Sequence, residues 1–241
     1  MNVRIIFPLL FLSTGCAATQ TPATGEPAVV LSPAEVGAPA SINAPFREPE
    51  LKVDSWTQRF EGESREVYRA RQEIVDALKI EPGQTVADVG TGTGLFVAYL
   101  SAAVGPTGRV IATDIAPSFI EHVQRRANAA GLKNVSVLLG ERADVKLEPS
   151  SVDLIYTCDT YHHFEDTAAI LATMRSALRP NGRLVVVDYH RIEGVTRPFL
   201  MTHVRAAREV FEAEIVGAGF TQLTAPEAPF LKENYLMVFR R

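Results

Sequence analysis

The sequence predicts a doubly wound α/β domain built on a mostly parallel sheet of seven strands. Three observations predict it. Short, nearly continuous apolar segments recur along the chain, which is typical of strands buried on both faces of a sheet. Segments with apolar residues at helical spacing separate these strands. Glycine and proline stand at many of the boundaries, as expected for turns. Helices and strands that alternate in this way favour parallel strands covered by helices on both faces.

The first predicted elements are a helix, a strand and a second helix. Residues 67–78 carry apolar side chains at helical spacing, and Pro82 and Gly83 close this segment. The apolar stretch 85–90 then runs into glycines and predicts a buried strand. Residues 95–104 predict the helix that follows it.

The middle of the domain repeats this alternation. Residues 109–114 predict the second strand, and 117–131 predict a helix with proline in its first turn and glycine at its end. Residues 135–139 and 152–158 predict the third and fourth strands.

The last part of the chain completes the sheet. A helix that Asp166 caps is predicted as far as Leu178, and the strand 183–189 follows it. A helix is then expected over 204–215. Two closing strands near the sheet edge are expected in the segments 219–224 and 235–241.

Charge and cysteine content limit the classes of partner. The chain has 24 basic and 28 acidic side chains, a formal charge of −4, so no general attraction to nucleic acid or anionic lipid is expected. A small-molecule partner is more natural. Cys16 and Cys158 lie far apart in different contexts, and this predicts neither a disulfide framework nor a zinc site.

The first residues have the layout of an export signal. A basic start, a short apolar run and small residues lead to Cys16, so residues 1–15 are predicted to be a signal peptide. This arrangement resembles the lipobox of bacterial lipoproteins and implies membrane attachment through lipidated Cys16. The match departs from the usual pattern because Leu12 lies four residues before the cysteine and Pro8 interrupts the apolar run. A plain signal peptide or an uncleaved apolar start remains the alternative.

Residues 16–50 are predicted to form a disordered tether, and residues 51–241 the folded domain. The segment 17–49 holds six of the 15 prolines, with many alanines and threonines. Such a composition buries too little apolar surface to offset the entropy lost on ordering.

A glycine-rich turn follows the first predicted strand. Asp88 precedes Gly90, Gly92 and Gly94, and a helix is expected directly after them. Glycine permits a sharp turn and a close approach of the backbone to a ligand, and the helix N-terminus offers free N–H groups. The spacing lacks the third glycine of the dinucleotide fingerprint, so NAD fits poorly. Asp114 ends the second strand, where a carboxylate can accept hydrogen bonds from both hydroxyls of a ribose.

The motifs VADVGTGTG, IATD, SVDLIYTCDTYHHF and LRPNGRLVVVD occur in this order. In combination they resemble the class I S-adenosylmethionine-dependent methyltransferases, from about Ser64 to the C-terminus. The resemblance implies a Rossmann-like methyltransferase fold, S-adenosyl-L-methionine as cofactor and methyl transfer as the activity.

The resemblance also implies roles for cofactor-binding residues. Asp88 would hold the amino-acid end of the cofactor, Asp114 the ribose, and Ile115 would pack on the adenine. The implied cofactor-binding residues are Asp88, Gly90, Gly92, Gly94, Asp114, Ile115, Glu141 and Asp144. Either Glu141 or Asp144 could reach the adenine amino group, and Asp144 is equally well explained as a solvated loop acid.

The acceptor is expected over the ends of the fourth and fifth strands. This places Asp159, Tyr161, His162 and His163 nearby as catalytic candidates. A histidine can take a proton near neutral pH, and only one of the adjacent pair is expected to point into the pocket. The alternative is that both histidines simply cap and pack.

No metal site is predicted. The histidines, Asp159, Asp188 and His190 show no compact ligand spacing. Cys158, at the end of a buried strand, is expected to behave as a small apolar residue.

Two further segments are predicted either to face the site or to be solvated surface. The first precedes the glycine turn and the second follows the fifth strand. The residues concerned are Tyr68, Arg69, Arg71, Arg197, His203, Arg205 and Arg208.

The HHF and LRPNGRL segments resemble those of ubiquinone and menaquinone C-methyltransferases and of arsenite methyltransferases. With Cys158 as the one cysteine beyond the anchor, arsenite is disfavoured, and a small phenolic or quinone-like acceptor is expected. The alternative is an envelope-anchored, non-catalytic binding protein that reuses the fold. The signal predicts a lipid-anchored location in the cell envelope, or a cytoplasmic one if it does not function. Nothing in the sequence predicts the oligomeric state.

Overall fold

The computed structural model describes residues 37–241. The predicted signal peptide, Cys16 and the tether as far as residue 36 lie outside the described residues. Between residues 37 and 241, every helix is too short or too polar to cross a lipid bilayer.

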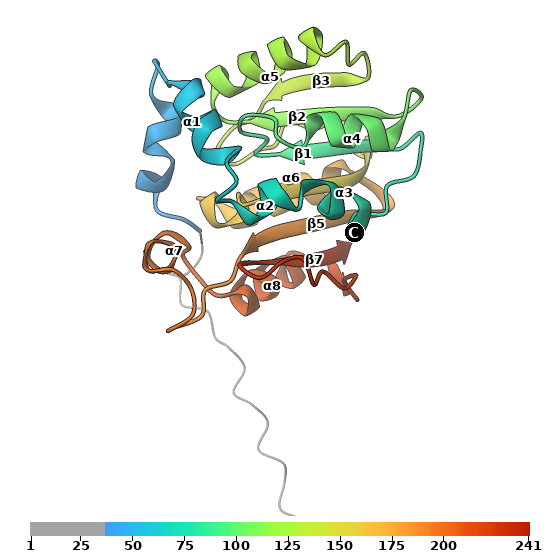
Figure 1. Ribbon diagram of the computed structural model, residues 1–241. Helices are drawn as coiled ribbons and strands as arrows, with labels where there is room; N and C mark the ends of the chain where they lie inside the picture. Colours follow the sequence, from blue (N-terminus) through green and yellow to red (C-terminus); the bar gives the residue numbers. More distant parts are fainter. Residues whose placement is uncertain (1–36) are drawn as a thin grey trace, which may run out of the picture. The chain divides into compact units, whose positions relative to one another are not determined.

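The domain is built on a seven-stranded sheet with the order β3-β2-β1-β4-β5-β7-β6 (Figure 1). Strands β1 to β5 are parallel, and β7 runs antiparallel to both β5 and β6. The predicted doubly wound sheet and its two closing strands are therefore confirmed. The strands are β1 Thr85–Val89, β2 Arg109–Asp114, β3 Val135–Leu139, β4 Val152–Cys158, β5 Leu178–Tyr189, β6 Thr221–Leu223 and β7 Asn234–Arg240.

Successive residues of the central strands enter two different cores because side chains alternate across a sheet. Val86 and Leu154 pack with helices α3 and α4, while Ala87 and Ile155 pack with α6 and α8 on the opposite face. All four side chains are fully buried. The helices are α1 Val53–Phe60, α2 Glu66–Arg69, α3 Arg71–Ala77, α4 Val97–Val104, α5 Pro117–Ala129, α6 Thr167–Ala177, α7 Pro198–His203 and α8 Arg208–Gly217.

Two predicted helices differ from those in the structure. The helix expected over 67–78 is divided at Ala70, whose ψ of 16° interrupts the α conformation between α2 and α3. The helix expected over 204–215 begins later, as α8, because Val204 is extended and ends α7. The predicted cap of α6 is confirmed, since the Asp166 carboxylate accepts a hydrogen bond from the Ala169 N–H.

The end of the predicted tether is ordered, which corrects its boundary. Residues Ala40–Arg47 form the 3-10 helix η2. The Ala38 N–H donates a hydrogen bond of 2.7 Å to the Phe164 carbonyl. Phe46, the first aromatic residue after the proline-rich stretch, packs on Trp56 with ring centroids 4.8 Å apart. The apolar surface that this ring buries stabilises the ordered conformation.

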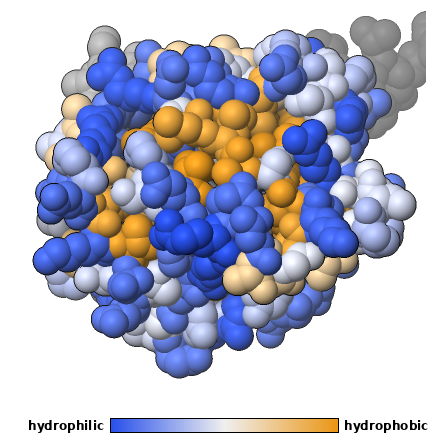
Figure 2. Space-filling view, turned by 90° about the horizontal axis from the view of Figure 1, so that it is seen from above, coloured by the Kyte–Doolittle hydropathy of each residue, from blue (hydrophilic) through white to orange (hydrophobic). Residues whose placement is uncertain are grey.

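Strand β3 is an outer strand of the sheet and is only half-buried. Leu139 at its end is 47% exposed. The side of the molecule that carries α5 and β3 shows apolar residues gathered at its centre and hydrophilic side chains around them (Figure 2). The strand order reverses between β1 and β4, far from this edge, and this reversal is where α/β sheets bind ligands.

Candidate active site

A cavity of about 680 Å³ lies at the carboxyl ends of the central strands. Its size is within the range of cofactor and small-molecule sites. The turns after β1, β2 and β4 line it, and η2, α1 and α7 add side chains from the other side. Elements that lie before and after the strand-end turns in the sequence therefore meet over one site.

The glycine turn has the backbone conformation that the sequence predicts, but its glycines serve different contacts. Gly90 and Gly94 have φ of +74° and +81°, which side chains rarely adopt. A Cβ on Gly90 would lie 2.1 Å from the Thr160 methyl group, and one on Gly94 would lie 2.9 Å from Val123 of α5. Gly90 and Gly92 line the cavity, whereas Gly94 does not. The cofactor contact predicted for Gly94 is replaced by helix packing.

Asp114 lies at the cavity where the sequence places it. One carboxylate oxygen accepts a hydrogen bond of 2.8 Å from the Gly92 N–H, and the other accepts one of 2.9 Å from the Ala116 N–H. Burial raises the pKa of Asp114, and these backbone donors oppose the shift. Each oxygen retains a lone pair that can accept from a ligand hydroxyl. Asp114 therefore orders the glycine turn and keeps acceptor capacity toward the cavity.

Asp88 is 3% exposed and also lines the cavity. It accepts a hydrogen bond of 2.7 Å from the Thr91 hydroxyl. Burial raises the pKa of Asp88 to about 7, the Thr91 bond opposes this shift, and the negative charge of Asp114 adds to it. The carboxylate is thus poised to gain from a cationic partner.

The remaining predicted cofactor residues form one rim of the cavity. Ile115, Glu141 and Asp144 all line it. Lys146 pairs with both acids, at 3.0 Å from Glu141 and 3.2 Å from Asp144. The Lys146 N–H also holds the pKa of Asp144 below its usual value. Both acids are exposed or half-exposed, so the structure keeps each as a candidate for this end of a ligand.

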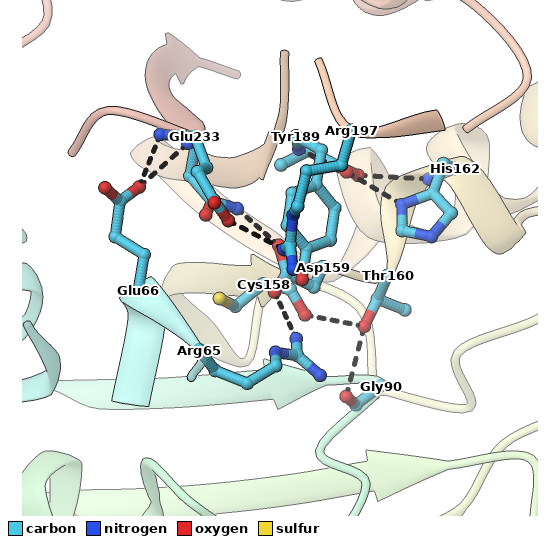
Figure 3. Close-up of polar contacts among 12 residues, drawn as sticks. Arg65, Glu66, Gly90, Cys158, Asp159, Thr160, His162, Tyr189, Arg197 and Glu233 are labelled. Atoms are coloured by element: carbon cyan, nitrogen blue, oxygen red, sulfur yellow. Dashed lines mark hydrogen bonds and ion pairs between the residues drawn. The ribbon is translucent and has the colours of Figure 1, made fainter. Parts of the chain in front are cut away.

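His162 forms the opposite end of the cavity and is 1% exposed. Its Nδ1 lies 2.7 Å from a carboxylate oxygen of Asp188 on β5, and its backbone N–H donates to the other oxygen (Figure 3). Because a carboxylate accepts, Nδ1 carries the proton and Nε2 keeps a lone pair. Nε2 is buried and has no hydrogen-bond partner among residues 37–241. The sequence prediction of a histidine at this end is supported by this geometry.

His163 also lines the cavity, which corrects the expectation that only one of the pair does so. The Asn43 amide nitrogen donates to the His163 carbonyl and to Glu165, so its oxygen faces His163 Nδ1, at 3.0 Å. His163 Nδ1 must therefore donate, and Nε2 keeps its lone pair. Burial, then the neighbouring histidines, lower the pKa of His163 to about 2. Burial, then the charges of His162 and Arg59, lower the pKa of His203 to about 4. Both rings are neutral at pH 7.

The other two predicted catalytic residues have structural partners. Tyr161 is fully buried, does not line the cavity, and donates a 3.0 Å hydrogen bond to Glu214, so its predicted catalytic role is wrong. Asp159 does line the cavity, but it pairs with Arg65 and accepts a 2.6 Å hydrogen bond from Asn234 (Figure 3). Burial raises the pKa of Asp159, and Arg65 opposes this shift.

Arg65 is a cavity residue that the sequence analysis missed. Tyr68 and Arg71, for which the sequence predicts either a place at the site or solvated surface, line a separate surface hollow. The adjacent Glu66 explains the placement of Arg65, because the Glu66 carboxylate accepts hydrogen bonds from the N–H groups of Glu233 and Asn234 at 2.9 Å each (Figure 3). A buried glutamate bound to a distant strand leaves no local signal in the sequence.

Part of the segment after β5 lines the cavity. Arg197 and His203 line the cavity, as one of the two readings predicts. Arg205 instead pairs with Glu214, at 2.6 Å, and its side chain is largely buried outside the cavity lining. Arg208 lies 4.0 Å from Glu212 on the surface of α8.

An aromatic wall completes the cavity. Phe46, Trp56, Phe60 and Phe119 pack on one another, with ring centroids 4.8–6.5 Å apart. Three of these rings come from residues 46–60, upstream of the glycine turn. The sequence signal for them is the appearance of aromatic residues after a long stretch that almost lacks them.

The strand order, the glycine turn at the reversal point and the acid on the neighbouring strand define the class. They are the features of the class I S-adenosylmethionine-dependent methyltransferase fold. A cavity between a buried acid and a ribose-type acid fits the S-adenosyl-L-methionine cofactor of this class.

The comparisons with known proteins agree. The chain belongs to the family described as "Methyltransferase domain", whose model matches residues 80–225. The solved S-adenosylmethionine-dependent methyltransferase from Aquifex aeolicus is 26% identical and superimposes with a TM-score of 0.69 over 77% of this chain and 97% of that chain. The family match gives no support to a non-catalytic binding protein.

Two curated relatives are similar to this protein over part of its length. Nocamycin O-methyltransferase of Saccharothrix syringae is 33% identical over 46% of this chain and 40% of its own length. Demethylmenaquinone methyltransferase of Staphylococcus aureus is 26% identical over 61% of this chain and 59% of its own. The chain therefore covers less than two thirds of either relative.

Proposed function

We propose that the protein transfers a methyl group from S-adenosyl-L-methionine to a small phenolic or quinone-like acceptor. One observation carries the proposal: the buried Nε2 lone pair of His162 faces a cavity that also holds the two cofactor-type acids. A proton acceptor, a cofactor end and an apolar wall thus share one enclosed space.

The residues at one end of the cavity fit S-adenosyl-L-methionine. Asp88 would bind the cationic amino group, Asp114 the ribose hydroxyls, and Ile115 would lie against the adenine. When bound, the cofactor supplies an electrophilic methyl group on sulfur. Gly90 and Gly92 keep this end free of bulky side chains, which lets the ligand lie against the turn.

The acceptor end fits a flat, mostly apolar ring. Phe46, Trp56 and Phe60 offer faces and edges on which an aromatic or quinone ring can pack. The two curated relatives are named as methyltransferases of nocamycin oxygen and of demethylmenaquinone, and the second name agrees with a quinone-like acceptor.

The chain's own residues then position the reaction and accept the proton. His162 Nε2 takes the proton of the acceptor hydroxyl, or of an activated ring carbon, as the bond from that atom to the methyl carbon forms and the methyl–sulfur bond breaks. Asp188 holds the ring in the required tautomer and balances the imidazolium charge. The aromatic wall excludes water from the reacting atoms.

The direct test is methyl transfer by the purified full-length protein. The cofactor carries a labelled methyl group, and a panel of phenols and quinols is offered as acceptors. The proposal expects label in the organic product and an equal amount of S-adenosylhomocysteine. Cofactor binding without any labelled product across the panel would contradict the acceptor class and leave the family assignment intact.

The affinity for the cofactor is expected to fall as the pH decreases from 8 to 6. Only the ionised form of Asp88 attracts the cofactor's amino group, and its pKa of about 7 means that this form is lost as the pH falls below that value. Calorimetry should give a dissociation constant about fivefold higher at pH 6 than at pH 7, because the ionised fraction of Asp88 falls from about one half to about one tenth. Asp88→Asn should bind weakly and without this pH dependence. An equally steep response in that variant would assign the titration to another group.

We also propose that the mature protein is anchored in the cell envelope through lipidated Cys16, where a lipid-soluble ring would be within reach. The support is the sequence of the first 16 residues. Fractionation of the tagged wild type should place it with membranes, and Cys16→Ala should release it into a soluble fraction. A soluble cytosolic location for both proteins would remove the anchor.

A further inference from the structure

Three histidines from two distant parts of the chain converge on the acceptor end of the cavity. His162 and His163 follow β4, and His203 ends α7. Each ring offers a nitrogen, and these three atoms all lie within 4.8 Å of one another. Ring centroids are 4.4–5.1 Å apart. Histidine is the commonest ligand of transition metals in proteins.

Two of the rings are already oriented as metal ligands usually are. A ligating histidine almost always donates its second N–H to a carboxylate or carbonyl oxygen, which fixes the ring and leaves the other nitrogen bare. His162 Nδ1 does so to Asp188 at 2.7 Å, and His163 Nδ1 does so to the Asn43 oxygen at 3.0 Å. In both rings the free lone pair is therefore on Nε2.

The His162 lone pair also needs a partner. A buried polar atom without a hydrogen bond costs free energy, and such atoms often mark a missing ion or ligand. His162 Nε2 is one, on a side chain that is 1% exposed. This observation is independent of the ring cluster and points toward the same space.

The distances allow coordination after a small contraction. With metal–nitrogen bonds of about 2.0–2.1 Å, the nitrogens of a tetrahedral site lie about 3.3 Å apart. The largest separation here therefore has to shorten by about 1.5 Å. His203, half-buried on the six-residue helix α7, is the ring with the most freedom to move.

We propose that His162, His163 and His203 together bind a divalent transition metal ion such as Zn²⁺. Neutral imidazoles suit zinc, iron, cobalt, nickel and copper, and the Asp188 carboxylate behind His162 supplies a compensating charge. Arg65, a cation near the cluster, is paired with Asp159. The sequence spacing hides the site because 39 residues separate His163 from the third ligand, which topology alone brings to the pair.

All three histidines line the cavity, so a metal that they held would be accessible from it, as in catalytic rather than structural metal sites. The next step rests on the proposed function. The acceptor's oxygen would bind the metal from the cavity side. A bound metal lowers the pKa of a coordinated hydroxyl, so the acceptor would lose its proton on binding. The single lone pair of His162 Nε2 cannot serve both roles, so it is the proton acceptor of the metal-free protein and a ligand in the metal-bound one, where the proton passes to solvent.

The test is titration of the untagged, chelator-treated full-length protein with Co²⁺, in the absence of cofactor and acceptor. The proposal expects saturable binding of one ion per chain, the intense visible absorption of tetrahedral cobalt, and its loss when Zn²⁺ is added. His203→Gln removes a half-buried ligand and should weaken binding by more than the roughly 10–100-fold typical of losing an orienting partner. Asn43→Ala should fall within that 10–100-fold range.

His122→Gln is the matched control, because this histidine lies on α5 outside the cavity, and it should bind like the wild type. Thermal melting of each variant shows whether it is folded. Unsaturable binding, octahedral absorption or an unchanged affinity in folded His203→Gln would overturn the proposal. Because no methyl donor is present, saturable cobalt binding without methyl transfer in the separate assay would refute only the proposed function.

Discussion

Replacing Asp114 with alanine is expected to weaken binding of S-adenosyl-L-methionine about 10²–10⁴-fold. Hydrogen bonds to a charged group contribute about 1.5–3 kcal/mol each, and the ribose would lose two of them. The change also removes the acceptor of the Gly92 N–H, so the glycine turn loses one of the contacts that hold it against β2. Isothermal titration calorimetry of the full-length protein measures the dissociation constant directly.

Asp76→Ala provides the control for this measurement. Asp76 is an exposed acid on α3, and its removal makes the same change in net charge far from the cavity. Its dissociation constant should match that of the wild type. If Asp114→Ala kept wild-type affinity while Asp76→Ala did too, the ribose would have to bind elsewhere and the assigned orientation of the cofactor would be wrong.

Replacing His162 with glutamine is expected to lower kcat about 10²–10⁴-fold, the usual contribution of a positioned proton acceptor. Glutamine keeps a polar side chain in the buried site but cannot take up a proton. Because His162 lies at the end of the cavity opposite Asp88 and Asp114, the affinity for the cofactor should stay within about twofold of the wild type, as expected for separate sites. Initial-rate kinetics and calorimetry together measure this split.

Asp188→Asn tests the same site without touching the ring that meets the acceptor. An amide in this position can present its NH₂ group to Nδ1 and so favour the wrong tautomer of His162, which would then carry its proton on Nε2. A large loss of kcat is expected. His122→Gln should keep full activity. Wild-type kcat in a folded Asp188→Asn protein would show that the tautomer of His162 does not matter.

Much of the fold could be predicted because its signals are local. Each central strand is a short apolar run, and each turn carries glycine, proline or a capping residue, as the Asp166 cap shows. The helix boundaries at Ala70 and Val204 could not be predicted, because backbone angles set by packing, rather than composition, end these helices.

The two ends of the site differ in how much the sequence reveals. Asp88 and Asp114 lie at the carboxyl ends of the adjacent strands β1 and β2, so strand order alone places them together. His203, Arg65 and Asn43 reach the cavity from helices whose positions depend on long-range contacts, such as that of Glu66 with β7. Tyr161 stands beside the histidines in the chain, yet its side chain points into the core, because neighbours in a short 3-10 turn face different directions.

Helix η2 contributes both to the wall of the cavity and to the orientation of a histidine ring. It supplies Phe46 to the wall of the cavity and Asn43 to the Nδ1 of His163. Any displacement of this segment that admits or releases a ligand on this side also frees the imidazole to rotate. The shape of the cavity wall and the orientation of the His163 ring therefore change together whenever this helix moves.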